Sequence, residues 1–272
     1  MDIGGALLLV GCGKMGGALL GGWLERGLAP ERVTVVEPLE ASVAGFAARG
    51  VAAVAEAGAL APDAAPAVVV LAVKPQQMDA AMPGLARFAR PGTVFLSIAA
   101  GKNIGYFEGH LGAAAAIVRA MPNTPAAVGR GMTVLCANPH VGAAQRTACG
   151  DLLAAVGETA WVEDEALLDP VTAVSGGGPA YVFLLIECLA EAGTAAGLPA
   201  ELAMRLARVT VAGSGELVHR APEPAGTLRE NVTSPGGTTL EALKVLMAPD
   251  GLQPLMTRAI AEATRRSREL AS

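Results

Sequence analysis

Short runs of apolar residues alternate with longer mixed stretches through the first half of the chain. A short run that is apolar throughout is typical of a strand buried on both faces of a parallel sheet. The pattern predicts such strands at residues 7–10, 33–36, 68–73, 93–98 and 115–119, with later strands at 132–136 and 159–162. Helices are expected at 17–26 and near 141–156. Because strands and helices alternate, we expect a doubly wound, parallel α/β sheet.

The second half of the chain has the pattern of an all-helical domain. Helices are predicted at residues 179–197, 199–220, 228–232, 238–247 and 252–270. The first of them is apolar nearly all round at 180–186, which predicts burial in a core or against another subunit. An acidic stretch bounded by proline, 163–170, separates the halves, so we expect domains at 1–163 and 164–272. A helical domain this small, apolar on several faces, commonly completes its core by dimerising.

Composition narrows the class of protein. Hydrophobic residues make up 52% of the 272 residues, enough for a sizeable core, and the net charge is −5 without any block of Lys or Arg. This pattern argues against nucleic acid and membrane surfaces as partners. No apolar run is expected to span a membrane, and we expect a cytoplasmic protein. The four cysteines form no CxxC pair and the three histidines are isolated, so no metal site is predicted.

A glycine-rich motif follows the first predicted strand and opens the first predicted helix. It consists of Gly11, Cys12, Gly13, Lys14, Met15 and Gly16. This context is the Rossmann fingerprint of dinucleotide binding. Gly11 makes the tight turn, Gly13 lets the backbone approach a pyrophosphate, and Gly16 lets the helix pack closely on the strand. Glu37 ends the second strand, where its carboxylate can accept hydrogen bonds from the adenosine ribose.

Further candidates lie where later strands end. Ligands of doubly wound sheets bind beyond the carboxyl ends of the strands. We therefore expect Lys74, the pair Ala99 and Ala100, and Asn123 to share a crevice with the glycine motif and a bound dinucleotide. The alternative for Lys74 is a solvated lysine at a strand end. The alternative for Asn123 is a turn former between two prolines.

A second motif lies between two predicted helices near the end of the chain. It consists of Ser234, Pro235, Gly236, Gly237, Thr238 and Thr239. Ser followed by Pro is a favourable helix start, but each following glycine costs about 1 kcal/mol of helix stability relative to alanine. Glycines at a helix N-terminus expose backbone N–H groups that can bind a carboxylate or a phosphate. The alternative is a glycine-rich loop that only caps an ordinary helix.

With both motifs, the chain resembles the pyrroline-5-carboxylate reductase family over its whole length. The resemblance rests on residues 11–16, 72–75, 120–125, 175–181 and 234–243, and the last two blocks are highly specific. It implies NADPH- or NADH-dependent reduction of a cyclic imine, a small-molecule substrate, to L-proline. It also implies a Rossmann domain and helices that intertwine into a homodimer. In many relatives the dimers build larger rings, and a decamer of dimers is one such assembly.

The resemblance also assigns roles to individual residues. The turn of Ser234, Gly236, Gly237 and Thr238 would hold the substrate carboxylate through backbone amides. The hydroxyl of Thr239, the catalytic candidate, would face the ring nitrogen.

On the cofactor side, the resemblance places Val73, Lys74 and Pro75 along the dinucleotide, with Asn123 at its nicotinamide end. Asn231 would hydrogen-bond cofactor or substrate. The alternative for Asn231 is the C-terminal cap of a helix.

Two departures from the family pattern bear on chemistry. Gly177 stands where many relatives have serine, which removes one hydroxyl near the site. Glu37 stands where many relatives carry a small polar or basic residue. A carboxylate repels a 2′-phosphate and pairs with a 2′-hydroxyl, so Glu37 favours NADH while the family favours NADPH. Glu37 could instead turn outward, with Arg49 partly neutralising it.

Two rival functions remain open from the sequence. One is another imine or β-hydroxy-acid reductase of the same two-domain shape, which usually places an acid/base lysine in its helical domain. Lys244 is the only lysine of the second half and would be that residue. The other rival is a non-catalytic dinucleotide-binding protein.

Overall fold

The computed structural model describes residues 3–271, which form two compact units. The first unit comprises Met1–Gly176 together with Ala263–Ser272, and the second comprises Gly177–Glu262. The chain therefore leaves the first unit after Gly176 and returns to it at Ala263. The second unit is inserted within the sequence of the first.

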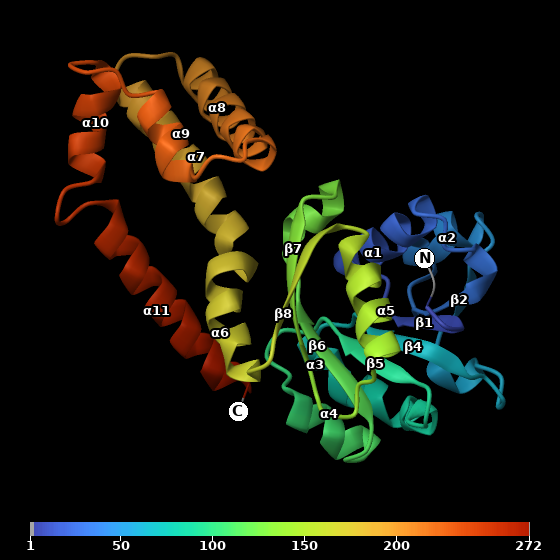
Figure 1. The fold of residues 1–272 in the computed structure, drawn as a ribbon. Coiled ribbons are helices and arrows are strands. Elements are labelled where there is room, and N and C mark those ends of the chain that lie inside the picture. The colour runs from blue at the N-terminus through green and yellow to red at the C-terminus, as the bar shows by residue number, and fades with distance from the viewer. Residues whose placement is uncertain (1–2, 272) are drawn as a thin grey trace. The chain divides into compact units, whose positions relative to one another are not determined.

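The first unit is built on an eight-stranded sheet (Figure 1). The strands lie in the order β3-β2-β1-β4-β5-β6-β7-β8. Every neighbouring pair is parallel except β6 and β7, which are antiparallel. The bounds are β1 (Ala6–Val10), β2 (Val33–Val36), β3 (Ala52–Val54), β4 (Pro66–Leu71), β5 (Val94–Ser97), β6 (Ala116–Met121), β7 (Gly131–Ala137) and β8 (Gly157–Val162). This arrangement confirms the expected Rossmann-type α/β fold.

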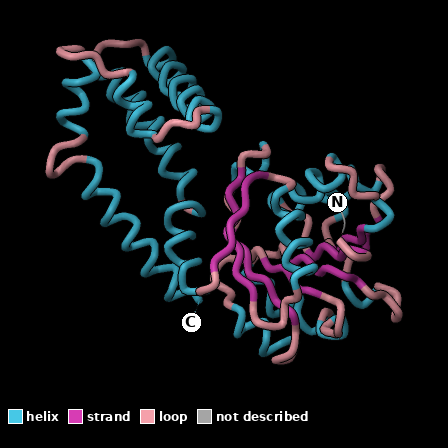
Figure 2. The backbone as a smooth tube through the Cα atoms, in the orientation of Figure 1, coloured by secondary structure: helices cyan, strands magenta, loops and turns pink. Residues whose placement is uncertain are grey.

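Helices cover the sheet and complete two cores, one on each of its faces (Figure 2). Alternation along β1 serves both cores, because Leu7 and Leu9 enter one and Leu8 and Val10 enter the other. Trp23 is fully buried, and its indole N–H donates to the Leu152 carbonyl at 2.7 Å. The main helices are α1 (Lys14–Glu25), α2 (Glu40–Ala47), α3 (Pro75–Ala81), α4 (Ile104–Leu111), α5 (Ala143–Ala154) and α6 (Leu168–Val171).

Two details of the sheet differ from expectation. The edge strand β3 was not predicted, because Ala52–Val54 is short and only partly buried. The antiparallel pairing of β6 with β7 was not predicted either. A short 3₁₀ turn, Thr124–Val128, joins these strands, whereas a parallel pair needs a crossover of a dozen or more residues.

The second unit is all helical. It contains α7 (Gly178–Ala195), α8 (Ala200–Arg220), α9 (Ala225–Asn231), α10 (Thr238–Leu246) and the first half of α11 (Leu252–Ala271). Helices α7 and α8 pack closely, because a Cβ on Gly193 would lie 3.3 Å from the Cβ of Ala203. Gly197 follows α7 with φ of +100°, as expected of a glycine that ends a helix.

Helix α7 carries a row of exposed apolar side chains. The row consists of Val182, Phe183, Leu184, Leu185 and Leu189. Burial of this segment in a core of its own chain, one of the two expectations, is therefore wrong. The other expectation, burial against another subunit, is the one compatible with these exposures.

One helical stretch, Glu165–Ala195, is long and apolar enough to cross a membrane by length and composition alone. One such helix does not overturn the expectation that no apolar run spans a membrane, and that expectation stays a prediction. The start of the stretch packs inside the first unit, because Leu168 is buried in one of its cores and the Asp169 carboxylate accepts a hydrogen bond from Ser267. The rest of the stretch includes α7 with its row of exposed apolar side chains.

The same contacts attach residues 164–176 to the first unit. The sequence-based division into 1–163 and 164–272 stays a prediction about domains, whereas the compact units divide at Gly176.

Candidate functional site

The glycine motif after β1 forms a cradle in the first unit. Gly11 has a φ of +93°, and a Cβ on it would lie 2.8 Å from the backbone of Ala72 and Val73. A Cβ on Gly16 would lie 2.3 Å from the Gly11 carbonyl oxygen. These two glycines are therefore required by the packing of the protein itself. A Cβ on Gly13 would meet nothing within 4 Å.

Open space at Gly13 is what a bound group needs. Gly13 is the N-cap of α1, and no side chain caps this helix end. The first-turn N–H groups of Lys14, Met15 and Gly16 are thus available to an anion. The cradle fits the pyrophosphate of a dinucleotide, because backbone can approach the ligand closely and the helix dipole favours negative charge.

Glu37 follows β2 and turns toward this cradle. The Cys12 N–H donates to its Oε2 at 2.8 Å, and the Leu39 N–H donates to its Oε1 at 3.0 Å. An outward orientation neutralised by Arg49 is therefore wrong. Burial, and then the charge of Glu37, raise the pKa of the Cys12 thiol to about 11, so this thiol is uncharged at neutral pH.

A cavity of about 360 Å³ lies beside the cradle. Gly11, Glu37 and Val73 line it together with Glu56, and its lining contains two carboxylates but no Lys or Arg. Sequence reasoning missed Glu56 because the strand before it, β3, was not predicted. The signal that could have found it is the run Val51–Val54, which follows Gly50 and ends two residues before Glu56.

Several predicted cofactor residues lie outside that lining. Lys74 is exposed at the N-cap of α3, with Pro75 at the first helical position. Ala99 is buried and Ala100 is exposed in the loop after β5. Their contact with a cofactor stays a prediction.

Asn123 connects two of the motifs behind the resemblance. Its Oδ1 accepts the Met132 N–H at 2.9 Å, and its Nδ2 donates to the Ser175 hydroxyl at 3.2 Å. Beside it, a Cβ on Gly176 would lie 2.4 Å from the Met121 Cε. Residues 120–125 and the short π-helical turn Thr172–Gly176 are therefore packed together. Asn123 does more than form a turn, although its place at a nicotinamide stays a prediction.

The second motif forms an exposed turn in the helical unit. The Gly237 N–H donates to the Ser234 carbonyl at 3.0 Å, and Gly236 has a φ of +69°. Helix α10 begins at Thr238 with Gly237 as its N-cap, which confirms the start of the predicted helix at 238–247. The glycine, which has no side chain to cap with, leaves the first-turn N–H groups of Thr238 and Thr239 available.

Two further residues of the helical unit were candidates. Asn231 is the last residue of α9, and it is exposed. Lys244, the acid/base candidate of a rival function, lies on α10 with its Nζ 2.7 Å from a carboxylate oxygen of Glu241. Both members of this ion pair are more than half exposed, so residues 3–271 do not bury Lys244.

Two family profiles match the chain. Residues 165–270 match one described as pyrroline-5-carboxylate reductase dimerisation. Residues 6–101 match one described as NADP oxidoreductase, coenzyme F420-dependent.

Curated relatives and solved structures cover nearly the whole chain. The pyrroline-5-carboxylate reductase of Pseudomonas aeruginosa is 41% identical over 269 residues, which cover 97% of this chain and 96% of the relative. That of Escherichia coli is 35% identical over 263 residues, covering 96% of each.

The structure of a pyrroline-5-carboxylate reductase from Coxiella burnetii superposes with a TM-score of 0.91 at 35% identity, covering 98% of this chain and 99% of that one. The Plasmodium falciparum pyrroline carboxylate reductase with NADP bound has a TM-score of 0.81 at 29% identity, covering 100% of both chains. With a glycine cradle that fits a dinucleotide, and with relatives at up to 41% identity over almost its full length, this chain belongs to the pyrroline-5-carboxylate reductase family.

Proposed function

We propose that this protein reduces 1-pyrroline-5-carboxylate to L-proline with NADPH or NADH. The observation that carries the proposal is the 41% identity over 97% of the chain to a curated reductase of that name. The two motifs supply the binding chemistry that the reaction needs. One is a cradle for a dinucleotide pyrophosphate, and the other is a turn with free N–H groups for a carboxylate.

The cofactor supplies the hydride when it is bound. The residues proposed to hold it lie in the cradle and at the strand ends: Gly11, Cys12, Gly13, Lys14, Met15, Gly16, Glu37, Val73, Lys74, Pro75, Ala99, Ala100, Asn123 and Asn231. Among them, Gly13 has the clearest support, because its Cβ position is open and its neighbours in α1 present free N–H groups.

The turn of the helical unit is proposed to hold the substrate. Ser234, Gly236, Gly237 and Thr238 would bind the carboxylate through backbone N–H groups, and Thr239 would place its hydroxyl at the ring nitrogen. The iminium form of the substrate already carries the proton that the product amine needs. A strong acid is therefore unnecessary, and hydroxyl and amide groups suffice to orient the C=N carbon.

NADH is the proposed preference between the two cofactors. Glu37 and Glu56 line the same cavity, and no Lys or Arg lines it with them. A 2′-phosphate placed there would face two carboxylates, whereas a 2′-hydroxyl could donate to one.

The assembly is proposed to be a homodimer through the helical domain, 164–272, with a decamer of dimers as one larger form. The matching dimerisation profile and the exposed apolar row of α7 support self-association. We propose a cytoplasmic enzyme whose partner is a small-molecule substrate, without nucleic acid or membrane. Its dinucleotide-binding domain would comprise 1–163.

The test is oxidation of NADH and NADPH, side by side, with 1-pyrroline-5-carboxylate as substrate. We expect turnover with both and a higher kcat/KM with NADH. Turnover that favours NADPH would retain the enzyme and refute the role given to Glu37 and Glu56. Absence of turnover with either cofactor would refute the substrate and return the imine and β-hydroxy-acid alternatives.

A further inference from the structure

The loop between β5 and α4, residues 98–103, lies at the edge of the sheet where dinucleotides bind. Strands β1, β4, β5 and β6 are parallel to one another, so their carboxyl ends meet at this edge. The glycine cradle follows β1 at the same edge, and the proposed cofactor residues Ala99 and Ala100 belong to the loop. Contacts that hold this loop in place should therefore affect the binding of the cofactor.

Asn103, the last residue of the loop, makes two different hydrogen bonds through one side chain. Its Oδ1 accepts the Tyr106 N–H at 2.7 Å and so caps α4. Its Nδ2 donates to the Ala271 carbonyl at 3.1 Å, at the end of α11. The last four carbonyls of a helix have no partner within the helix, so the amide of Asn103 satisfies a group that would otherwise be free.

Backbone contact adds to that bond. Gly101 has a φ of +73°, and a Cβ on it would lie 3.3 Å from the Leu270 carbonyl oxygen and 3.5 Å from the Leu270 Cβ. The backbone of the loop at Gly101 therefore lies against the last turn of α11, and the absence of a side chain at Gly101 permits this close approach.

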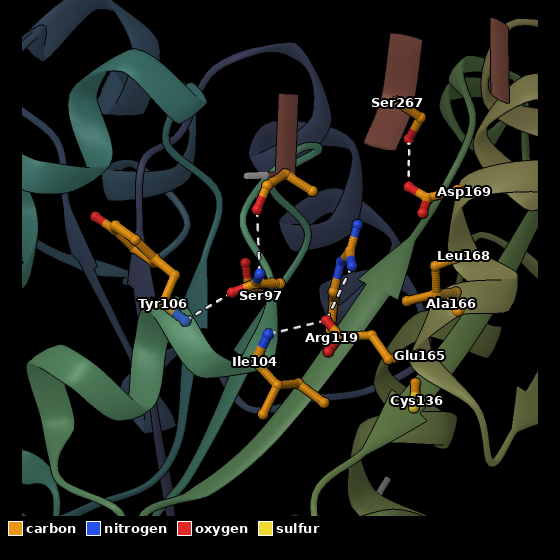
Figure 3. Close-up of polar contacts among 12 residues, drawn as sticks. Ser97, Ile104, Tyr106, Arg119, Cys136, Glu165, Ala166, Leu168, Asp169 and Ser267 are labelled. Carbon is orange, nitrogen blue, oxygen red and sulfur yellow. Dashed lines mark hydrogen bonds and ion pairs between the residues drawn. The ribbon is translucent and has the colours of Figure 1, made fainter. Parts of the chain in front are cut away.

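The end of α11 is itself held in place by a residue that lies 98 positions earlier in the sequence, Asp169 (Figure 3). The Ser267 hydroxyl donates to the Asp169 Oδ1 at 2.7 Å, and both side chains are buried. On the other side of the loop, the Ile104 N–H donates to the Glu165 Oε1 at 2.8 Å, and the Arg119 guanidinium donates to the same oxygen at 2.9 Å. Asn103 thus joins two parts of the first unit that are each also held to residues 165–169 by bonds of their own.

We propose that Asn103 is a positioning residue for cofactor binding, because it ties the 98–103 loop to the end of α11. Through this bond, a helix that reaches the first unit from the other end of the sequence holds the loop that carries Ala99 and Ala100. The proposal rests on the placement of the cofactor given under the proposed function. It is tested by removing each end of the bond separately.

Asn103→Asp removes the donor and keeps the cap, because aspartate is as good an N-cap as asparagine. Ending the chain at Leu270 removes the Ala271 acceptor instead and keeps the contact of Leu270 with Gly101. A neutral hydrogen bond contributes about 1 kcal/mol, so each change should raise the KM for NADH by about fivefold. The KM for 1-pyrroline-5-carboxylate should stay near that of the parent enzyme. In the shortened chain, Asn103→Asp should have no further effect, because both changes break one bond.

Two controls separate positioning from stability. Asp164→Asn makes the reverse carboxylate-to-amide exchange at an exposed N-cap, where Asp164 accepts the Ala166 N–H, and should leave the KM for NADH unchanged. Asn103→Ser keeps a capping oxygen, but its side chain is too short to reach α11. It should therefore raise the KM for NADH as expected for Asn103→Asp, and it replaces that variant if Asn103→Asp folds poorly.

An unchanged KM for NADH in the variants, or additive effects in the shortened chain, would overturn the proposal, even if the melting temperature falls. The dissociation constant of NADH, measured by its fluorescence in the absence of substrate, reads the same effect without catalysis. A parent enzyme that binds NADH but does not turn over would refute the proposed reaction and leave this test intact.

Discussion

The three glycines of the cradle are present for different physical reasons. Gly11 and Gly16 have no room for a Cβ because their own protein occupies it. Gly13 has room, and its φ of −72° is open to any residue, so packing gives no reason for a glycine there. The remaining reason is a ligand that must come close to the backbone.

A matched pair of variants separates these reasons. Gly16→Ala should destabilise the fold by about 1–3 kcal/mol, because the new Cβ would meet the Gly11 carbonyl. Gly13→Ala should leave the melting temperature nearly unchanged and raise the KM for NADH about tenfold or more, because the methyl group occupies ligand space. Thermal melts and cofactor titrations measure both. Equal melting temperatures for the two variants would contradict this assignment.

Thr239 is the residue whose replacement should act on the chemical step. Thr239→Val keeps the shape and removes the hydroxyl, and we expect kcat to fall roughly tenfold to a hundredfold with little change in the KM for NADH. Thr239→Ser, which keeps the hydroxyl, should retain most of the activity. Steady-state kinetics with each substrate varied in turn would measure this. A Val variant as active as the Ser variant would remove Thr239 from the mechanism.

Sequence reasoning at this scale found residues that motifs mark and missed those that only folding brings together. Glu37 was found because it ends an apolar strand. Its bonds to the Cys12 and Leu39 N–H groups could not be predicted, because they depend on the side-chain rotamer. Glu56 was missed because β3, the strand that leads to it and to the cavity, was not predicted.

At the scale of elements, a strand was predictable where its residues are buried on both faces. The runs that became β1, β2, β4 and β5 contain at most one polar residue each, Thr34 in β2 and Ser97 in β5, so their pattern admits few alternatives. Edge strand β3 has two exposed alanines and gives no such signal. The start of α10 was predicted at residue 238 although Ser234 and Pro235 resemble a helix start, and Gly236 adopts a positive φ that keeps the turn before Thr238 out of the helix.

Helices α3 and α4 are connected by a polar cluster whose contribution to stability should depend on pH. The Tyr106 hydroxyl donates to Asp79, with the Lys102 ammonium 3.5 Å from the same carboxylate and the His110 ring against Tyr106. The Tyr106 hydrogen bond, followed by the positive charge of Lys102, lowers the pKa of the Asp79 carboxyl below 3.8. A carboxyl with a lowered pKa contributes stability above its unfolded pKa and loses it as the pH falls through the folded value.

Asp79→Asn should therefore lower the melting temperature at pH 7, and the difference from the parent enzyme should shrink toward pH 3. Thermal melts across this range provide the measurement. Asp63→Asn is the matched control, because Asp63 is exposed and forms no ion pair within residues 3–271. A constant difference for Asp79→Asn across the range would show that its charge does not contribute.

At the scale of the whole molecule, the single chain leaves apolar surface on its helical unit uncovered. Phe183 of α7 is 61% exposed, although phenylalanine is among the most buried residue types. In a family whose profile names a dimerisation region, a second copy is the expected cover.

Phe183→Glu should dissociate the proposed dimer or weaken it strongly, because burying an unpaired carboxylate in an interface is costly. Leu39→Glu is the matched control for oligomeric state, since Leu39 of the first unit is exposed to the same 61%. Sedimentation velocity or light scattering on both variants measures the outcome. A Phe183→Glu dimer as tight as the parent would place the interface elsewhere.

The return of the chain to the first unit at Ala263 is the part of the architecture that could not be predicted from the sequence. The helix at 252–270 was predicted as one element of the helical half, and its residues up to Glu262 do belong to the helical unit. Its end belongs to the other unit because of particular partners, Asp169 for Ser267 and Asn103 for Ala271. Amphipathic patterning shows that a helix has an apolar face but does not show what that face contacts.

Because the second unit is inserted, the first unit is made of two separate pieces of chain. A fragment ending at Gly176 would lack the Ser267 hydroxyl and leave the buried Asp169 carboxylate without that donor. Such a fragment should bind dinucleotide poorly when it is expressed alone. It should bind a separate short peptide with the sequence of residues 263–271. The nucleotide-binding half of this enzyme is thus a natural starting point for a split reporter, whose reassembly would be read out by the return of dinucleotide binding.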